Sequence, residues 1–120
     1  MLHQLTASLA IARLNAVRLN EPVTLCPTED GRRCRTDRVW ENGWMAYRDP
    51  GRSPHPATGA DVLEYVNAPT TGMLARSSAG RHRVRFLPTG WASGSNLSVR
   101  ICSQGRGRWL GTVVVSNAGR

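Results

Sequence analysis

The first 22 residues constrain the fold most, because one long helical repeat in them comes to an abrupt stop. Leucine and alanine recur there at spacings of three and four, the period of an α-helix with one apolar stripe. Pro22 ends the pattern, since the residue before a proline is biased toward an extended conformation. No capping residue precedes the repeat, so we expect the helix to be part of a longer one. The predicted stripe consists of Leu2, Leu5, Leu9, Ala12, Ala16 and Leu19.

After Pro22 the sequence is typical of short β-strands bounded by Gly, Pro, Asn or Ser. Residues 49–60 contain three prolines and are predicted to form a surface loop. The expected fold is α+β, with an N-terminal amphipathic α-helix (residues 1–20) packed on an antiparallel β-sheet in a β-rich globular part (residues 21–120). The predicted strands are 23–26, 44–48, 62–66, 84–87, 97–102 and 112–116.

Charge divides the chain into two unequal halves. Residues 1–64 hold eight arginines and all eight acidic residues, whereas residues 65–120 hold eight arginines and no acid, and therefore carry the whole formal charge of +8. A basic segment without acids indicates a polyanionic partner. All sixteen cations are arginine, whose planar donor fork matches phosphate geometry. A GC-rich genome would also favour arginine.

Alternation in two predicted strands places arginine on the face that the helix does not cover. The arginines of residues 81–86 share one face, opposite Val84 and Phe86, and Arg100 points outward from residues 97–102. Other arginines lie in glycine-rich turns or at the end of the sequence. For any one of them an ordinary solvated strand face is the alternative. The expected DNA-binding band consists of Arg81, Arg83, Arg85, Arg100, Arg106, Arg108 and Arg120.

Two cysteines are close enough in sequence to form a short disulfide. Cys26 and Cys34 bracket a turn over residues 27–31, and a bridge there would favour an oxidising compartment. Cys102 either remains a free thiol or replaces one of them in the bridge. The chain has no C-x2-C spacing, and its three histidines are scattered. We therefore expect no zinc site and no other cofactor.

Neither catalysis nor single-strand binding is strongly indicated. The chain contains no nucleophile elbow, zinc-protease motif, Walker loop or dinucleotide fingerprint. Carboxylates such as Asp30 and Asp49 lie beside turns, where they commonly accept bonds from backbone amides. We therefore predict that the protein is not an enzyme. Trp109, beside Arg106 and Arg108, is a candidate for stacking on an unpaired base, although such a tryptophan more often covers the end of a small core.

The order of local signatures resembles that of the GspH/FimT family of type II secretion pseudopilins and type IV minor pilins. The matching segments span nearly the whole chain, in the family's order and spacing. They are Leu9 to Arg18, Pro22 to Pro27, Trp40 to Trp44, Asp49-Pro50, Arg85 to Gly90, Leu97 to Cys102 and Val113 to Arg120.

The resemblance implies a minor pilin with a periplasmic globular part, anchored in the inner membrane by a preceding half-helix and assembled with other minor and major pilins. One branch serves as structural tip subunits that prime filament assembly. The FimT-like branch is linked to DNA uptake in natural transformation, with a Gly-Arg-x-Arg motif near the C-terminus that contacts DNA. Gly119-Arg120 matches the first half of that motif, and the sequence ends before its second arginine.

Overall fold

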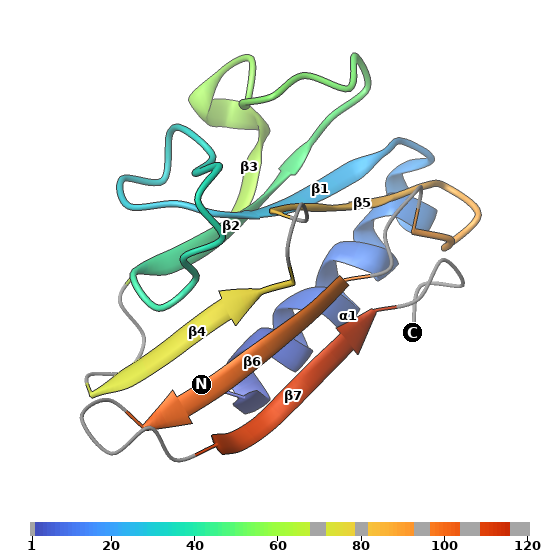
Figure 1. The fold of residues 1–120 in the computed structure, drawn as a ribbon. Coiled ribbons are helices and arrows are strands. Elements are labelled where there is room, and N and C mark those ends of the chain that lie inside the picture. Colours follow the sequence, from blue (N-terminus) through green and yellow to red (C-terminus); the bar gives the residue numbers. More distant parts are fainter. Residues whose placement is uncertain (1, 68–71, 79–81, 93–96, 104–108, 116–120) are drawn as a thin grey trace.

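The structure, a computed structural model, describes residues 2–67, 72–78, 82–92, 97–103 and 109–115. One helix and two antiparallel sheets make up this part of the chain, and α1 lies behind both sheets in Figure 1. The four-stranded sheet has the order β3-β2-β1-β5 and the three-stranded sheet the order β4-β6-β7. The elements are α1 (Leu2–Leu19), β1 (Val23–Pro27), β2 (Gly43–Arg48), the 3-10 turn η1 (Gly59–Asp61), β3 (Val62–Asn67), β4 (Met73–Ser77), β5 (Val84–Phe86), β6 (Leu97–Ser103) and β7 (Trp109–Val115).

The predicted helix is confirmed, and four members of its predicted stripe are buried; Leu19 is half-buried, and the side chain of Leu2 lies outside the described part of the structure. Leu5, Leu9, Ala12 and Ala16 are all buried in the main core. The helix ends in a Schellman motif, because Asn20 has a φ of 55° and the amides of Asn20 and Glu21 bond to the carbonyls of Val17 and Ala16, respectively. The helix therefore already ends through these two backbone hydrogen bonds, before the chain reaches Pro22.

The main core lies between α1 and the sheets. Alternate residues of β1 and β5 point into it, namely Val23, Leu25, Val84 and Phe86. The buried indole of Trp44 in β2 donates a hydrogen bond from Nε1 to Ser8 Oγ at 2.9 Å, which ties the helix to the four-stranded sheet. β6 and β7 add Leu97, Val99, Ile101 and Val113 from the second sheet.

The predicted α+β fold class is confirmed, but the strand prediction was incomplete. The described part of the chain forms two antiparallel sheets where one was expected, and β4 was not predicted. The sequence of β4 lacks β-branched residues, so its strand conformation depends on pairing with β6. The segment before Trp40 covers its other edge, because Trp40 N donates to Ala75 O at 2.9 Å and Ser77 N donates to Arg38 O at 3.2 Å.

The outer face of the four-stranded sheet carries a second, smaller core. Cys26 and Cys34 form the predicted disulfide, with their Cα atoms 5.6 Å apart. This bridge packs with the buried side chains of Met45 and Tyr47, and with Val62. Cys102 is a free, partly exposed thiol, which decides between the two alternatives left by the sequence.

Candidate nucleic-acid interface

The structure describes part of the predicted arginine band. Arg83, Arg85 and Arg100 lie among the described residues. Trp109 begins β7, but its side chain lies outside the described part of the structure, so base stacking stays a prediction. The remaining members of the band also lie outside the described residues: Arg81, Arg106, Arg108 and Arg120.

Arg85 lies on the predicted face of β5, opposite Val84 and Phe86, but its guanidinium group forms an ion pair with Asp49. Nε and Nη2 of Arg85 donate to Asp49 Oδ2 at 3.1 and 3.0 Å. The register β2-β1-β5 explains this pair, because it aligns Thr24 with Arg85 beside the end of β2, where Asp49 lies. The Arg85 side chain is 20% exposed and that of Asp49 only 1%. The expectation that β5 presents Arg85 freely to solvent is therefore wrong.

The buried carboxylate of Asp49 organises the loop that follows β2. Asp49 Oδ2 also accepts from Thr24 Oγ1 at 2.7 Å, and Asp49 Oδ1 accepts from Ser53 N at 2.6 Å. Burial, with the Asp49 charge as the next cause, raises the pKa of Tyr47 to about 12, so its phenol remains protonated and donates to Ser53 O at 2.9 Å. Arg83 is half-buried and also reaches Ser53 O, at 3.4 Å from Nη1. On this surface Asp49 neutralises Arg85, and both arginines bind the loop that follows β2.

The outer face of the three-stranded sheet differs, because it carries an arginine that has no counter-charge among the described residues. The registers of β4, β6 and β7 place Arg76, Arg100 and Thr112 in one row across the sheet. Arg100 is exposed, with its buried neighbours Val99 and Ile101 pointing to the core. Arg100 has no hydrogen bond or ion pair with any residue that the structure describes.

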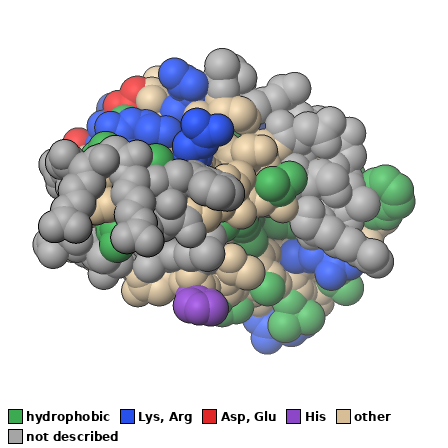
Figure 2. Space-filling model, turned by 60° about the horizontal axis from the view of Figure 1, so that its bottom comes forward, with side chains coloured by type: hydrophobic (Ala, Val, Ile, Leu, Met, Phe, Trp, Pro, Cys, Tyr) green, Lys and Arg blue, Asp and Glu red, His purple; other side chains and the backbone are tan. Residues whose placement is uncertain are grey.

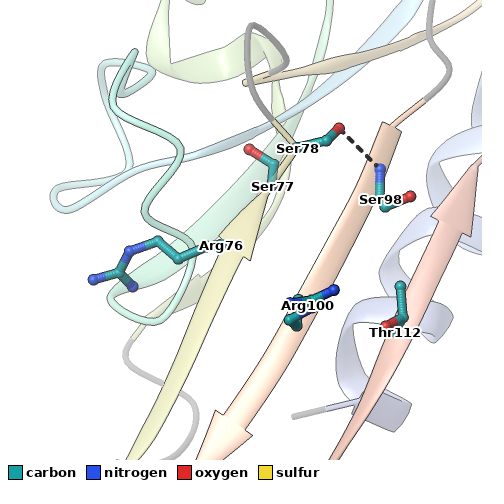
Figure 3. Close-up of a pocket in the computed structure, with 6 residues that line it drawn as sticks. All are labelled: Arg76, Ser77, Ser78, Ser98, Arg100 and Thr112. Carbon is teal, nitrogen blue, oxygen red and sulfur yellow. Dashed lines mark hydrogen bonds between the residues drawn. The ribbon is translucent and has the colours of Figure 1, made fainter. Parts of the chain in front are cut away.

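A depression of about 360 Å³ lies on this face. Figure 3 shows that its lining residues come from β4, β6 and β7 and their ends, with Arg100 on the middle strand, β6. Ser78 and Ser98 close one end, where Ser98 N donates to Ser78 Oγ at 3.3 Å and Ser78 N donates to Ser98 O at 2.8 Å. We call this depression the sheet groove; its lining residues are Arg76, Ser77, Ser78, Ser98, Arg100 and Thr112.

Arg76 is a groove residue that the sequence analysis missed. Its guanidinium forms an ion pair with Glu41, and Figure 3 shows the side chain directed away from Arg100. The Arg76 side chain is 47% exposed, whereas that of Glu41 is 14% exposed and also accepts a hydrogen bond from Ala75 N at 3.1 Å. The signal that could have found Arg76 is the absence of any acid near it in sequence. Its place in the groove depends on the unpredicted strand β4.

A second exposed surface is apolar. Ile11, Leu14 and Val17 lie on the helix face opposite the core and are 43, 63 and 49% exposed. Trp91 is 57% exposed, and its neighbour Gly90 accepts a hydrogen bond from Arg13 Nε at 3.1 Å. In Figure 2, hydrophobic side chains adjoin basic ones in one area of the surface. Basic side chains adjoin acidic ones in a separate area.

Neither a metal-binding group nor a membrane-spanning helix is found in the described part of the structure. Its histidine, cysteine and acidic residues form no group of three or more that could hold a metal ion. Of the residues that can be placed, none belong to a helix long and apolar enough to span a membrane.

Comparisons with known proteins agree on the kind of molecule. A family model described as type II transport protein GspH matches residues 2–119. No curated protein sequence matches the chain. A crystal structure of the type IV minor pilin FimU of Pseudomonas aeruginosa (strain PAO1), in space group P21, has a TM-score of 0.73 at 18% identity, covering 98% of this chain and 81% of the other. A second FimU crystal structure, in space group P65, has a TM-score of 0.72 at 20% identity, covering 98% and 85%. At this identity the likeness establishes the fold.

Proposed function

The chain belongs to the GspH family of minor pilins and pseudopilins, and on that premise we propose that it binds DNA without sequence preference through arginines of its C-terminal half. The observation that carries the proposal is the complete absence of acidic residues after Glu64, against eight arginines. Phosphate contacts by arginine supply affinity that does not depend on base sequence. The activity served would be DNA uptake in natural transformation, by a subunit with its globular part in the periplasm and its place in a pilus.

The described arginines support different parts of this proposal. Arg100 is exposed and without a counter-charge in the described part of the chain, so it is available to a phosphate. Arg83 and Arg85 are engaged by Ser53 and Asp49 and would contribute mainly through long-range charge. For Arg81, Arg106, Arg108 and Arg120 the proposal rests on their charge and glycine-rich context alone.

An electrophoretic shift with duplex DNA at several salt concentrations tests the proposal. If about three to five phosphates are neutralised, the logarithm of the binding constant should fall against log salt with a slope of about −3 to −4.5. Affinity of one subunit should be weak, and several subunits on a filament would gain by avidity.

A matched pair of triple variants removes the effect of net charge. Arg106, Arg108 and Arg120 changed together to Gln should abolish the shift. The control changes Arg32, Arg33 and Arg52, which are exposed in the neutral half, to Gln. It lowers the net charge equally and should retain most of the affinity. Equal losses in both variants would show non-specific attraction to net charge, and an unshifted wild type at low salt would overturn the proposal.

A second function is favoured by the apolar helix face. A purely structural subunit would prime filament assembly by packing Ile11, Leu14 and Val17 against other pilins, because exposed large apolar side chains in a row mark an interaction surface. Leu14→Ser would then impair piliation and leave the DNA shift unchanged. The arginine variants would do the reverse.

A further inference from the structure

The sheet groove places two arginines directly opposite each other on neighbouring strands. Arg76 and Arg100 are partners in the β4-β6 register, so their side chains leave the same face of the sheet. Like charges in this position are destabilising. Glu41 neutralises Arg76, but no described carboxylate neutralises Arg100. An anion bound beside Arg100 would turn this local repulsion into attraction.

Resting on the DNA binding proposed above, we propose that the sheet groove is a seat for one phosphate group of the DNA backbone. Arg100 supplies the charge, and the guanidinium of Arg76, whose side chain is 47% exposed, supplies a second donor. Ser78 Oγ accepts the bond from Ser98 N, so its own hydroxyl proton can be donated to a phosphate oxygen. A phosphate bound by arginine and hydroxyl donors forms charge-assisted hydrogen bonds.

Glu41 limits the strength of this seat. Its carboxylate is held by Ala75 N and draws the guanidinium of Arg76 away from Arg100. A phosphate must therefore compete with Glu41 for Arg76. Glu41→Gln keeps an oxygen that can accept from Ala75 N but removes the negative charge. This substitution frees Arg76 to turn toward the groove, and the site becomes stronger than in the wild-type protein.

Inorganic phosphate is the first probe, and its binding is measured through amide chemical shifts in a sulfate-free buffer. Phosphate should shift the amide signals of Ser78, Ser98 and Arg100 together. Arg100→Gln should weaken binding at least about tenfold, as expected for loss of a charge-assisted contact, and Glu41→Gln should strengthen it. Arg52→Gln, an exposed change outside the groove, should have no effect. The groove assignment is overturned if Arg100→Gln binds phosphate like the wild type, or if the shifts map elsewhere.

Duplex DNA is the second probe and separates the groove from the wider proposal. Loss of one phosphate contact in Arg100→Gln should make the salt slope shallower by about 0.9, so that affinity falls about threefold less between 50 and 200 mM salt. Glu41→Gln should steepen the slope by up to the same amount. Wild-type binding with slopes unchanged in both variants would reject the groove and leave DNA binding by the other arginines intact. Phosphate binding in the groove without any DNA shift would reject the DNA function itself.

Discussion

The outer faces of the two sheets treat arginine in opposite ways. On the four-stranded sheet, loops cover the face, and Arg85 is bound by the buried carboxylate of Asp49. On the three-stranded sheet, the face carries the sheet groove, and Arg100 has no described counter-charge. The difference follows from the distribution of acids along the chain, because β1, β2 and β3 belong to the half that contains them. An arginine bound to a buried acid holds a fold together, whereas an arginine without a partner is available to a ligand.

The largest expected effect comes from removing the acid on the covered face. Asp49→Ala deprives Thr24 Oγ1, Ser53 N and Arg85 of one shared acceptor and leaves a mostly buried guanidinium uncompensated. Breaking a buried pair by deleting one partner costs about 3–5 kcal/mol. Urea denaturation should show a loss of this size in the free energy of unfolding.

The control for Asp49 is an ion pair that water reaches. Glu21 accepts two hydrogen bonds from Arg48 at 2.7 and 2.8 Å, but Arg48 and Glu21 side chains are 40 and 28% exposed. Glu21→Gln should therefore cost much less than Asp49→Ala, since exposed pairs contribute little. Similar losses in the two variants would contradict the structural role assigned to the buried pair.

The second effect concerns the disulfide, which also belongs to the covered face. Cys26→Ser with Cys34→Ser opens a bridge that spans eight residues, and the chain-entropy relation gives a loss of about 2.5 kcal/mol. Thermal unfolding should show the same shift for the double variant and for reduced wild-type protein. Cys102→Ser should change neither value, because Cys102 is not bridged. A large effect of Cys102→Ser would point to thiol exchange in solution.

The sequence predicts features that depend on local periodicity and not those that depend on register. The helix and its stripe were predictable because Leu5, Leu9, Ala12 and Ala16 repeat at the helical period. The disulfide was predictable because its cysteines flank one turn. The strand β4 was not, because Met73–Ser77 becomes a strand only through its pairing with β6.

The charge pattern was predictable in total but not in detail. Counting residues was enough to find the basic half, yet Asp49 and Arg85 are 36 positions apart and meet only after β1 has been placed between β2 and β5. The groove depends in the same way on the alignment of Arg76 with Arg100. Tertiary pairing therefore decides which candidate arginines are bound by an acid and which are available to a ligand. No local pattern in the sequence contains that information.

A third, smaller effect should appear in acid on the covered face. The amides of Arg32 and Arg33 donate to Asp30 Oδ1 at 2.8 and 3.1 Å and hold the pKa of Asp30 below its usual value of 3.8. A carboxylate with a lowered folded pKa stabilises the fold above pH 3.8 and loses this contribution as pH falls through the folded pKa.

Hydrogen exchange can measure that acid effect residue by residue. Between pH 5 and pH 2.5 the protection factors of the Arg32 and Arg33 amides should fall by up to about fivefold, the equivalent of one weak hydrogen bond. Amides of β6 should keep their protection, because residues 97–103 contain no carboxylate. Asp30→Asn should remove the pH dependence of the two amides. Equal losses of protection in β6 and in this turn would indicate global acid unfolding.

The smallest expected effect is the most direct test of the contrast between the two faces. Arg100→Gln should leave the free energy of unfolding unchanged or raise it by up to about 0.5 kcal/mol, because it removes like-charge repulsion with Arg76 across the register. Arg85→Gln should be strongly destabilising, since it leaves the buried carboxylate of Asp49 without its counter-charge. Parallel urea titrations of both variants, each with the same change in net charge, make the comparison. If Arg100→Gln destabilised the protein as much as Arg85→Gln, Arg100 would be a structural residue, and the reason to expect a phosphate beside it would disappear.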